Sequence, residues 1–269
     1  KVKAKWQKKE VVVNSFLSIP NTFTAEIMSE QGYDALTIDY QHGMIGFSDL
    51  FTMLQSIRNS GVTPICRVSG LDHAVISKVM DAGALGIICP MINNKDQAQK
   101  LVQDCKYPPM GIRSFGPTRA NFSVSSNYFY ESNEGTFCLA MIETQEAFDN
   151  LDDIASTPGL DGLYIGTADL TIGLNQGKLT PGFDRTEPEM IESKKKILEI
   201  AHKHGKVACL HCGTPEYAAK ASEWGFDLVT ITNDVRLLSG AAATHVRKFK
   251  ELTNQNYDES DKDNNPSSY

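Results

Sequence analysis

Two acidic residues, Glu143 and Asp169, could together bind a metal ion. Glu143 ends the apolar run FCLAMIE (137–143), and Asp169 comes three residues after the run GLYIG (162–166). Carboxylate oxygens suit a hard divalent ion such as Mg²⁺, for which Mn²⁺ or Co²⁺ could substitute. Each residue also has a structural interpretation, because Asp169 could cap a helix and Glu143 stands just before one. The spacing alone leaves both interpretations open.

A second group of candidate residues comprises Arg67, Asp39 and His42. Arg67 lies in the apolar run PICRV (64–68), and a buried guanidinium needs an anion to face. That anion could be Asp39, or it could be a carboxylate or enolate oxygen of a substrate. His42 could act as a general acid or base with Asp39 orienting it, although a histidine in a loop can equally be structural.

The segment IGTADL (165–170) could bind an anion through its backbone. The amides of Thr167, Ala168 and Asp169 would point outward where a helix begins. An imine mechanism has no support, because it needs a lysine at the end of a strand and Lys206 precedes its apolar run. The residues therefore favour metal-dependent chemistry.

Repeated helical segments and apolar runs place these polar residues on one edge of a fold. Six helical segments end at a glycine, which suits the left-handed residue that stops a helix. An apolar run without polar alternation follows each glycine and indicates a strand buried on both faces. The glycines are Gly32, Gly61, Gly83, Gly159, Gly205 and Gly225, and the runs are ALTID (35–39), PICRV (64–68), GIICP (86–90), GLYIG (162–166), VACLH (207–211) and LVTIT (228–232).

The pattern predicts a single (β/α)8 TIM barrel, for which about 250 residues are typical. Polar residues past the strand ends, including His211, Asn233 and Asp234, would then meet at the catalytic rim. Residues 107–135 are predicted to be a long irregular stretch, which is usually functional in a compact barrel. We expect strands at 11–19, 35–39, 64–68, 86–90, 137–143, 162–166, 207–211 and 228–232, and helices near 23–31, 47–59, 73–82, 94–105, 145–156, 188–204, 215–224 and 235–251.

Composition excludes several classes of protein. The 269-residue chain carries a net charge of −7, whereas nucleic-acid-binding proteins are more often basic, and no apolar run approaches the roughly 20 residues of a membrane span. We expect one domain over 1–251 and a disordered acidic tail over 252–269. The chain starts at Lys1 rather than Met, so a removed leader stays an open alternative.

Cysteine usage predicts a reducing, cytoplasmic setting. Four of the six cysteines fall inside predicted strands, where cysteine behaves as a small buried apolar residue. Cys209 and Cys212 have the spacing of a redox pair or half of a zinc site. However, no second pair exists, and an odd spacing on a strand points the two side chains apart.

Ordered motifs from about residue 10 to 250 resemble the HpcH/HpaI family. These are class II, metal-dependent aldolases of the phosphoenolpyruvate/pyruvate barrel superfamily, which act through pyruvate enolates. The resemblance implies a homo-oligomer, a hexamer built from dimers that exchange the helix over 235–251. The motifs are TIDYQH (37–42), CRV (66–68), VMDAGALGIICPM (79–91), KYPPMGIRSFGPTRA (106–120), MIET (141–144) and YIGTADLTIGL (164–174).

The resemblance also implies a role for each matching residue. Glu143 and Asp169 would bind Mg²⁺, and Arg67 would contact the keto or enolate oxygen. His42, with Asp39, would stand in the acid/base position. The amides near Ala168 and Asp169 would hold the pyruvyl carboxylate, and Asp81 would reach the site of a neighbouring subunit.

Two departures from the family pattern point to a repurposed site. Gln41 replaces an acidic residue before the motif histidine, and Thr167 replaces the proline of Gly-Pro-Ala-Asp. The resemblance implies decarboxylation of oxaloacetate to a bound pyruvate enolate, which would add to an electrophilic acceptor, a 2-pyrone, and yield a benzoate. Tyr128 and Tyr130 are candidates for a wall of the acceptor pocket. The alternatives are a class II aldolase acting on 2-keto-4-hydroxy acids, and a non-catalytic barrel that binds a keto acid.

Overall fold

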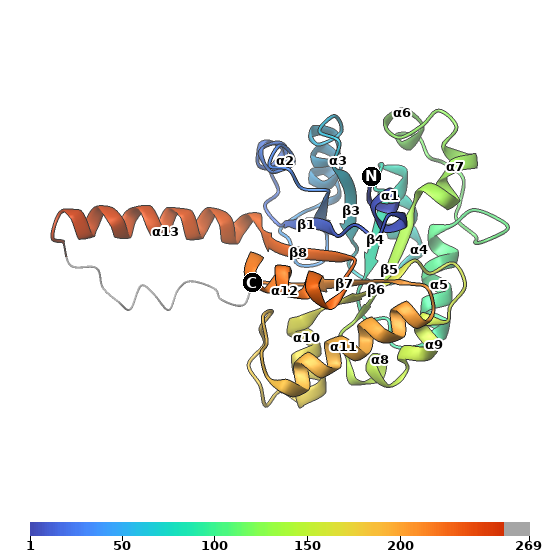
Figure 1. The fold of residues 1–269 in the computed structure, drawn as a ribbon. Helices are drawn as coiled ribbons and strands as arrows, with labels where there is room; N and C mark the ends of the chain where they lie inside the picture. Colours follow the sequence, from blue (N-terminus) through green and yellow to red (C-terminus); the bar gives the residue numbers. More distant parts are fainter. Residues whose placement is uncertain (256–269) are drawn as a thin grey trace.

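The computed structural model describes residues 1–255, and its central feature is a closed barrel of eight parallel strands (Figure 1). Each strand pairs with the next along the chain, and the last pairs with the first. This confirms the predicted (β/α)8 barrel. The strands are β1 (Val12–Leu17), β2 (Ala35–Asp39), β3 (Thr63–Arg67), β4 (Gly86–Cys89), β5 (Phe137–Ile142), β6 (Gly162–Ile165), β7 (Val207–His211) and β8 (Leu228–Asn233).

Helices follow the strands and cover the outside of the barrel (Figure 1). All six glycines predicted to stop helices have positive φ angles, from 67° at Gly205 to 112° at Gly83. The helices are α1 (Val2–Gln7), α2 (Thr22–Ser29), α3 (Phe47–Ser56), α4 (His73–Asp81), α5 (Lys95–Cys105), α6 (Ala120–Ser123), α7 (Tyr128–Gly135), α8 (Gln145–Asp149), α9 (Leu151–Ala155), α10 (Thr167–Asn175), α11 (Pro188–Lys203), α12 (Pro215–Trp224) and α13 (Asp234–Leu252).

Side-chain caps explain where several helices begin. The Asn21 side chain caps α2, because it accepts a hydrogen bond from the Thr24 amide. Helix α3 begins at Phe47, as the expected range 47–59 has it. Gly46 is the N-cap residue there, and the Asp49 carboxylate reaches back to accept the Gly46 amide at 2.9 Å.

Helix α10 begins directly after β6, where the IGTADL segment indicated a helix start. Three other features of the fold differ from the sequence-based expectation. Helix α1 precedes the barrel. The stretch 107–135 is not wholly irregular, because α6 and α7 form in it with Tyr128 and Ser132 buried one turn apart. The helix expected over 145–156 is two helices that meet at Asn150, whose side chain donates to the Asn93 carbonyl at 2.9 Å.

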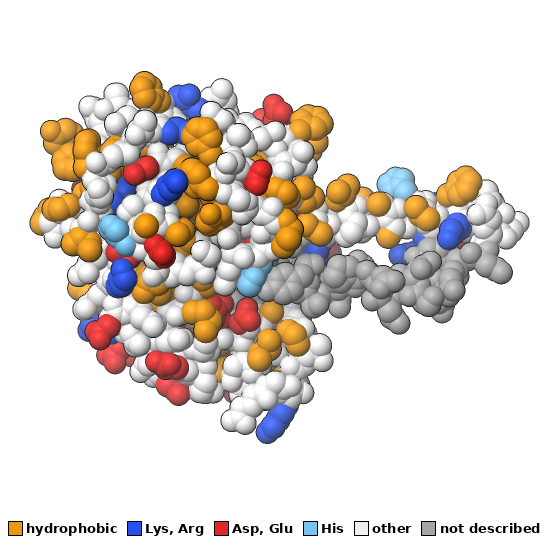
Figure 2. Space-filling view, turned by 180° about the vertical axis from the view of Figure 1, so that it is seen from behind, with side chains coloured by type: hydrophobic (Ala, Val, Ile, Leu, Met, Phe, Trp, Pro, Cys, Tyr) orange, Lys and Arg blue, Asp and Glu red, His pale blue; other side chains and the backbone are white. Residues whose placement is uncertain are grey.

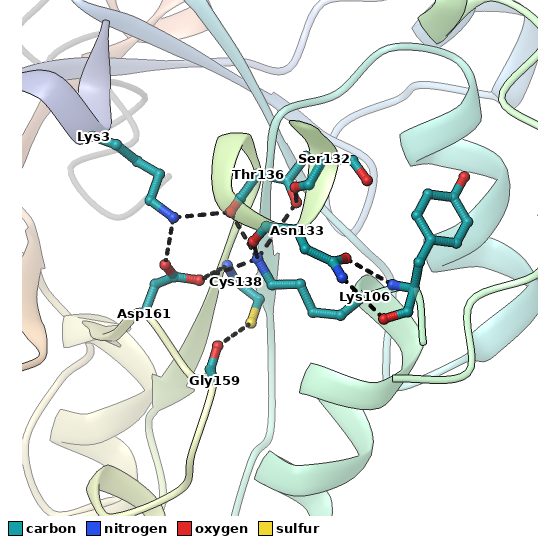
Figure 3. A network of polar contacts seen from close by, with 9 residues as sticks. Lys3, Lys106, Ser132, Asn133, Thr136, Cys138, Gly159 and Asp161 are labelled. Carbon is teal, nitrogen blue, oxygen red and sulfur yellow. Dashed lines mark hydrogen bonds and ion pairs between the residues drawn. The ribbon is translucent and has the colours of Figure 1, made fainter. Parts of the chain in front are cut away.

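The end of the barrel at which the strands begin is closed by α1 and a buried polar network (Figure 3). Trp6 of α1 packs edge-on against Phe137 with ring centroids 5.0 Å apart. The Lys106 ammonium is buried and donates to the carbonyls of Asn133 and Thr136, both at 2.8 Å. Because an unpaired buried ammonium is costly, these contacts hold the end of α7 against Lys106 at the end of α5. This leaves the opposite end open for chemistry.

Inside the barrel, apolar side chains alternate with a small polar set. Alternate strand residues point inward, so Val12, Phe16, Leu139 and Met141 fill the interior with their neighbours. Four further buried residues carry polar groups into the same space, and they hydrogen-bond to one another. These are Asn14, Thr37, Tyr164 and Thr230.

Helix α13 projects away from the barrel (Figure 1), and apolar side chains lie along it (Figure 2). Leu238, Val246 and Phe249 are all exposed in this chain. None of the helices within residues 1–255 is long and apolar enough to cross a membrane. Most of the predicted acidic tail, residues 256–269, lies outside the described residues.

Candidate active site

A cavity of about 250 Å³ opens at the carboxyl ends of the strands. Its wall includes Asp39, Arg67 and Asp169, and also His42, which were all predicted from the sequence as rim residues. Apolar side chains complete much of the wall, among them Phe16, Met44, Met141, Phe183 and Val235. A mostly apolar cavity with a few convergent charged groups is typical of a small-molecule site.

On the β2–β3 side, Arg67 and Asp39 form a bidentate ion pair. Arg67 Nε donates to Asp39 Oδ1 at 2.8 Å, and Arg67 Nη2 donates to Oδ2 at 2.7 Å. The Asp39 Oδ1 atom also accepts the backbone amides of Gln41 and His42. Burial would raise the pKa of Asp39, but the hydrogen bonds and charge of Arg67 outweigh it and hold the pKa below its usual value. Both residues are therefore charged, and Arg67 is held in place.

On the β5–β6 side, Glu143 is a buried carboxylate with a second carboxylate nearby. Burial raises the pKa of Glu143 to about 7, and the charge of Asp169 adds to that rise. One oxygen, Oε1, accepts the Met91 amide at 2.6 Å, which opposes the rise. Met91 has a φ of 57°, an uncommon conformation for a residue with a side chain. The chain after β4 is thus bent to direct an amide at Glu143.

Gly166, the residue after β6, leaves room for the Glu143 carboxylate. A Cβ atom added to Gly166 would lie 2.6 Å from Glu143 Oε2. Gly166 lines the cavity and is the N-cap residue of α10. The free amides of the first turn of α10, at Thr167, Ala168 and Asp169, therefore stand at the cavity wall, where an anion is favoured.

The β7–β8 side of the cavity holds a histidine among aromatic rings. His211, the last residue of β7, stacks on Phe183 with ring centroids 4.7 Å apart and an interplanar angle of 21°. Phe16 meets the same imidazole edge-on, also at 4.7 Å. Burial, together with the charge of Arg67, lowers the pKa of His211 to about 3, so the ring is neutral.

The sequence matches the HpcH/HpaI aldolase/citrate lyase family over residues 13–239. The chain belongs to this family. Its members are class II aldolases and lyases that depend on a divalent metal ion. A hydroxypyruvate/pyruvate aldolase from Rhizorhabdus wittichii is 38% identical over 252 residues, which cover 94% of this chain and 99% of that protein.

Solved structures of family members share the fold. The HpcH/HpaI aldolase from Desulfitobacterium hafniense aligns with a TM-score of 0.86 and 25% identity, covering 95% of this chain and 99% of that chain. Macrophomate synthase, which the sequence motifs had suggested within the family, aligns with a TM-score of 0.77 and 24% identity, covering 93% and 89%. A citrate lyase β subunit from M. tuberculosis, complexed with oxaloacetate and magnesium, aligns at 0.55 and 14%, covering 84% and 92%.

Glu143 and Asp169 fit a divalent cation. Both offer hard oxygen donors, and burial together with the charge of Asp169 raises the pKa of Glu143. A cation bound by both would stabilise the two charged carboxylates. The pair therefore has the donor chemistry that a divalent ion requires.

Three predicted residues lie away from the cavity, and Glu143 lies behind the wall residue Gly166 rather than among the lining residues. Tyr128 is buried against Arg113, whose Nη1 donates to its hydroxyl at 3.0 Å, and Tyr130 is 84% exposed. Asp81 accepts a hydrogen bond from Arg113 at 2.6 Å. None of the three lines the cavity of this chain. The structure adds Met91, Gly166, Phe183 and His211, of which only His211 carried a sequence signal, its position at a strand end.

Proposed function

We propose that the protein is a metal-dependent aldolase that forms or cleaves the carbon–carbon bond of 2-keto-4-hydroxy acids through a pyruvate enolate. The supporting observation is one cavity lined by Asp169, an oriented arginine and the amino-terminal end of α10, with the buried Glu143 carboxylate against the wall residue Gly166. The 38% identity to a hydroxypyruvate/pyruvate aldolase supports the same reaction class.

Glu143 and Asp169 would hold the divalent ion, which we propose to be Mg²⁺, with Mn²⁺ or Co²⁺ as substitutes. When bound, such an ion would supply positive charge beside the keto acid oxygens and favour the enolate. The amides of Thr167, Ala168 and Asp169 would accept the carboxylate of the keto acid at the start of α10.

Arg67 would stabilise the negative charge that grows on the enolate oxygen. Its Nε and Nη2 atoms are committed to Asp39, so the guanidinium is oriented before substrate arrives. Asp39 acts as a positioning residue, because it holds both Arg67 and the backbone of His42. His42, on the cavity wall, would exchange the proton of the acceptor oxygen.

A second candidate reaction is decarboxylation of oxaloacetate followed by coupling of the enolate, with a 2-pyrone acceptor and a benzoate product as in the sequence-based hypothesis. Gln41 favours it, because its neutral side chain stands beside His42, and its Oε1 atom has no hydrogen-bond partner among the described residues. Loss of CO₂ makes the enolate without a base, so it does not need an acidic residue there. Tyr128 and Tyr130 remain candidates for contacts to the pyrone only if another subunit brings them to the site.

The experiment is to incubate the protein with Mg²⁺ and either pyruvate or oxaloacetate, together with a panel of aldehydes and 2-pyrones. Aldol products from pyruvate and an aldehyde would support the first candidate. Coupled products that form only from oxaloacetate would support the second. Binding of a keto acid with no metal-dependent turnover of any pair would contradict both and leave the keto-acid-binding barrel.

We also propose that the protein is a homo-oligomer, a hexamer in which α13 packs on a neighbouring subunit. The exposed Leu238, Val246 and Phe249 on α13 support it, because such a row is usually covered. Asp81 would then approach the neighbour's site. Sedimentation should give a species larger than a dimer, and a monomer at micromolar concentration would contradict the proposal.

We place the protein in the cytoplasm, with a small-molecule substrate and no nucleic-acid or membrane partner. All six cysteines are free and buried, including Cys209 and Cys212 of the C-x-x-C pattern. Thiols of this kind suit a reducing compartment. Fractionation of cells that express the tagged protein tests this placement.

A further inference from the structure

A chain of buried hydrogen bonds crosses the interior of the barrel and ends at His211. The Thr37 hydroxyl donates to Asn14 Oδ1 at 3.1 Å, and Asn14 Nδ2 donates to Thr230 Oγ1 at 2.9 Å. The Tyr164 hydroxyl lies 2.8 Å from Thr230 Oγ1 and 3.0 Å from His211 Nδ1. The first four residues are fully buried, so each proton in the chain needs an acceptor within it.

The chain links the tautomer of His211 to its buried partners. Between Tyr164 and Thr230 either hydroxyl can donate, and the Tyr164–His211 contact can run in either direction. Because Thr230 Oγ1 already accepts the Asn14 amide, an arrangement in which Thr230 donates to Tyr164 and Tyr164 donates to His211 Nδ1 gives both hydroxyl protons an acceptor. In that arrangement the neutral imidazole carries its proton on Nε2. Among the hydrogen bonds between described residues, none involves Nε2.

The ring of His211 is also fixed in orientation. Phe183 covers one face of the imidazole, and Phe16 contacts its edge. The Thr167 hydroxyl donates to the His211 carbonyl at 2.9 Å and ties the end of β7 to the start of α10. His211 is 8% exposed and lines the cavity. With Nδ1 bound to a buried hydroxyl, Nε2 is the nitrogen available to a ligand.

We propose that His211 determines acceptor specificity by donating its Nε2 proton to the hydroxyl of an uncharged hydroxyaldehyde. This inference rests on the proposed aldolase function. The keto acid is assigned to the arc of the rim from Arg67 on β3 to Asp169 after β6. The acceptor therefore faces the remaining arc, which comprises β7, β8 and β1, where His211 borders the cavity.

The chemistry of that arc fits an uncharged acceptor with one further oxygen. Its cavity-lining side chains include the apolar Phe16, Phe183 and Val235, which favour apolar groups of the acceptor over charged ones. His42 is assigned to the acceptor oxygen that becomes the aldol hydroxyl. His211 then has a separate partner, the hydroxyl on the neighbouring carbon, as in glycolaldehyde.

The first test reads the tautomer directly. Nitrogen-15 NMR of the histidine-labelled full chain should show His211 protonated at Nε2, with the signal assigned by its loss in His211→Gln. Tyr164→Phe removes the hydroxyl that holds Nδ1, so the Nε2 preference should weaken. Protonation of His211 at Nδ1, or an unchanged tautomer in Tyr164→Phe, would overturn the proposal.

The second test compares glycolaldehyde with acetaldehyde, which differ only by the hydroxyl. The ratio of their kcat/KM values with pyruvate and Mg²⁺ should fall about tenfold in His211→Phe, the value expected for one neutral hydrogen bond. His211→Gln should retain part of the preference, because its amide can donate. His202→Gln, an exposed histidine on α11, is the matched control and should keep the wild-type ratio.

Failure of the proposed aldolase function can be distinguished from failure of the His211 proposal by an experiment on the wild-type protein. Solvent deuterium should enter the pyruvate methyl group in the presence of Mg²⁺, which reports the enolate without any acceptor. Absence of both exchange and turnover would remove the proposed function. Normal exchange and turnover, with an acceptor ratio unchanged in His211→Phe, would overturn the role of His211 alone.

Discussion

The two charged sides of the cavity differ in the signs of their charges. At the β2–β3 side, Arg67 and Asp39 have opposite charges and bind each other through two hydrogen bonds. At the β5–β6 side, Glu143 and Asp169 have the same charge. Arg67 holds the pKa of Asp39 low against the effect of burial, whereas burial and Asp169 raise the pKa of Glu143 to about 7.

The difference separates a side whose charges are balanced within the chain from a side with like charges. An ion pair is balanced before any ligand binds, so it can orient Arg67 and the loop after β2 in advance. Two like charges repel each other, and we propose that a divalent cation balances them. If this comparison is right, the two sides respond differently to mutation, metal and pH.

The largest effect is expected from the carboxylates at the β5–β6 side. Glu143→Gln and Asp169→Asn should each lower metal-dependent turnover roughly 10³-fold or more, because the charge supplied by a metal is worth several kcal/mol. Mg²⁺ should raise the melting temperature of the wild type but not of either variant. Glu146→Gln, in the first turn of α8, is the control and should behave as wild type. Full activity in EDTA would end the metal hypothesis.

The next effect concerns Arg67. Arg67→Ala should slow decarboxylation of oxaloacetate about 10²–10³-fold, or roughly 3–4 kcal/mol, because an oxyanion loses its oriented donor. The variant also leaves Asp39 buried and unpaired, which destabilises the fold by about 3–5 kcal/mol.

Combining Arg67→Ala with Asp39→Asn removes the unpaired charge and separates these two consequences. The double variant should recover stability in denaturant unfolding without recovering the rate. A wild-type decarboxylation rate in Arg67→Ala would show that the ion pair is only structural.

A smaller effect is expected at Gly166. An added Cβ atom would lie 2.6 Å from Glu143 Oε2 and 2.8 Å from Met141 Cε, so the carboxylate must move. Gly166→Ala should weaken Mg²⁺ binding about 10–100-fold, the range seen when a ligand loses its orientation. Calorimetric titration measures this, with Gly70→Ala as the control because no atom lies within 4 Å of its Cβ position. Unchanged affinity would mean that Glu143 is not a ligand.

The smallest effect is the pH dependence of the stability that the Arg67–Asp39 ion pair contributes. Asp39 has a lower pKa in the folded chain than the value of about 3.9 in the unfolded chain. Its contribution to the free energy of unfolding is therefore complete above about pH 4 and is lost as pH falls through the folded pKa. The stability difference between wild type and Asp39→Asn should shrink in denaturant unfolding between pH 6 and pH 3, by about 1.4 kcal/mol per unit of lowered pKa. A constant difference would contradict the assignment.

The fold was predictable because its signals are local and repeated. Gly83 and Gly225 stop helices through their own backbone angles, and Asn21 caps α2 through a bond three residues away. Features that depend on distant contacts were missed. The short α1 is such a case, because Trp6 packs on Phe137 from far along the chain.

The site was predictable as far as strand ends determine it. Arg67 and Asp169 line one cavity because parallel strands end at a common rim. The roles of Gly166 and Phe183 were not readable, because the first depends on a close approach to Glu143 and the second on a loop that folds back over His211. Tyr128 was expected near the acceptor, but its contact with Arg113 holds it elsewhere in this chain.

Helix α13 begins at the wall of the cavity. It has 19 residues, and at 1.5 Å per residue it is about 28 Å long. At its root, the Asp234 carboxylate accepts the backbone amides of Ser18 at 2.9 Å and Ile19 at 3.1 Å. Ser18 and Val235 both belong to the cavity wall. A molecule that binds the far end of α13 would therefore act on residues of the cavity wall. A tilt of about 5° at the first turn of the helix would move its far end by about 2–3 Å.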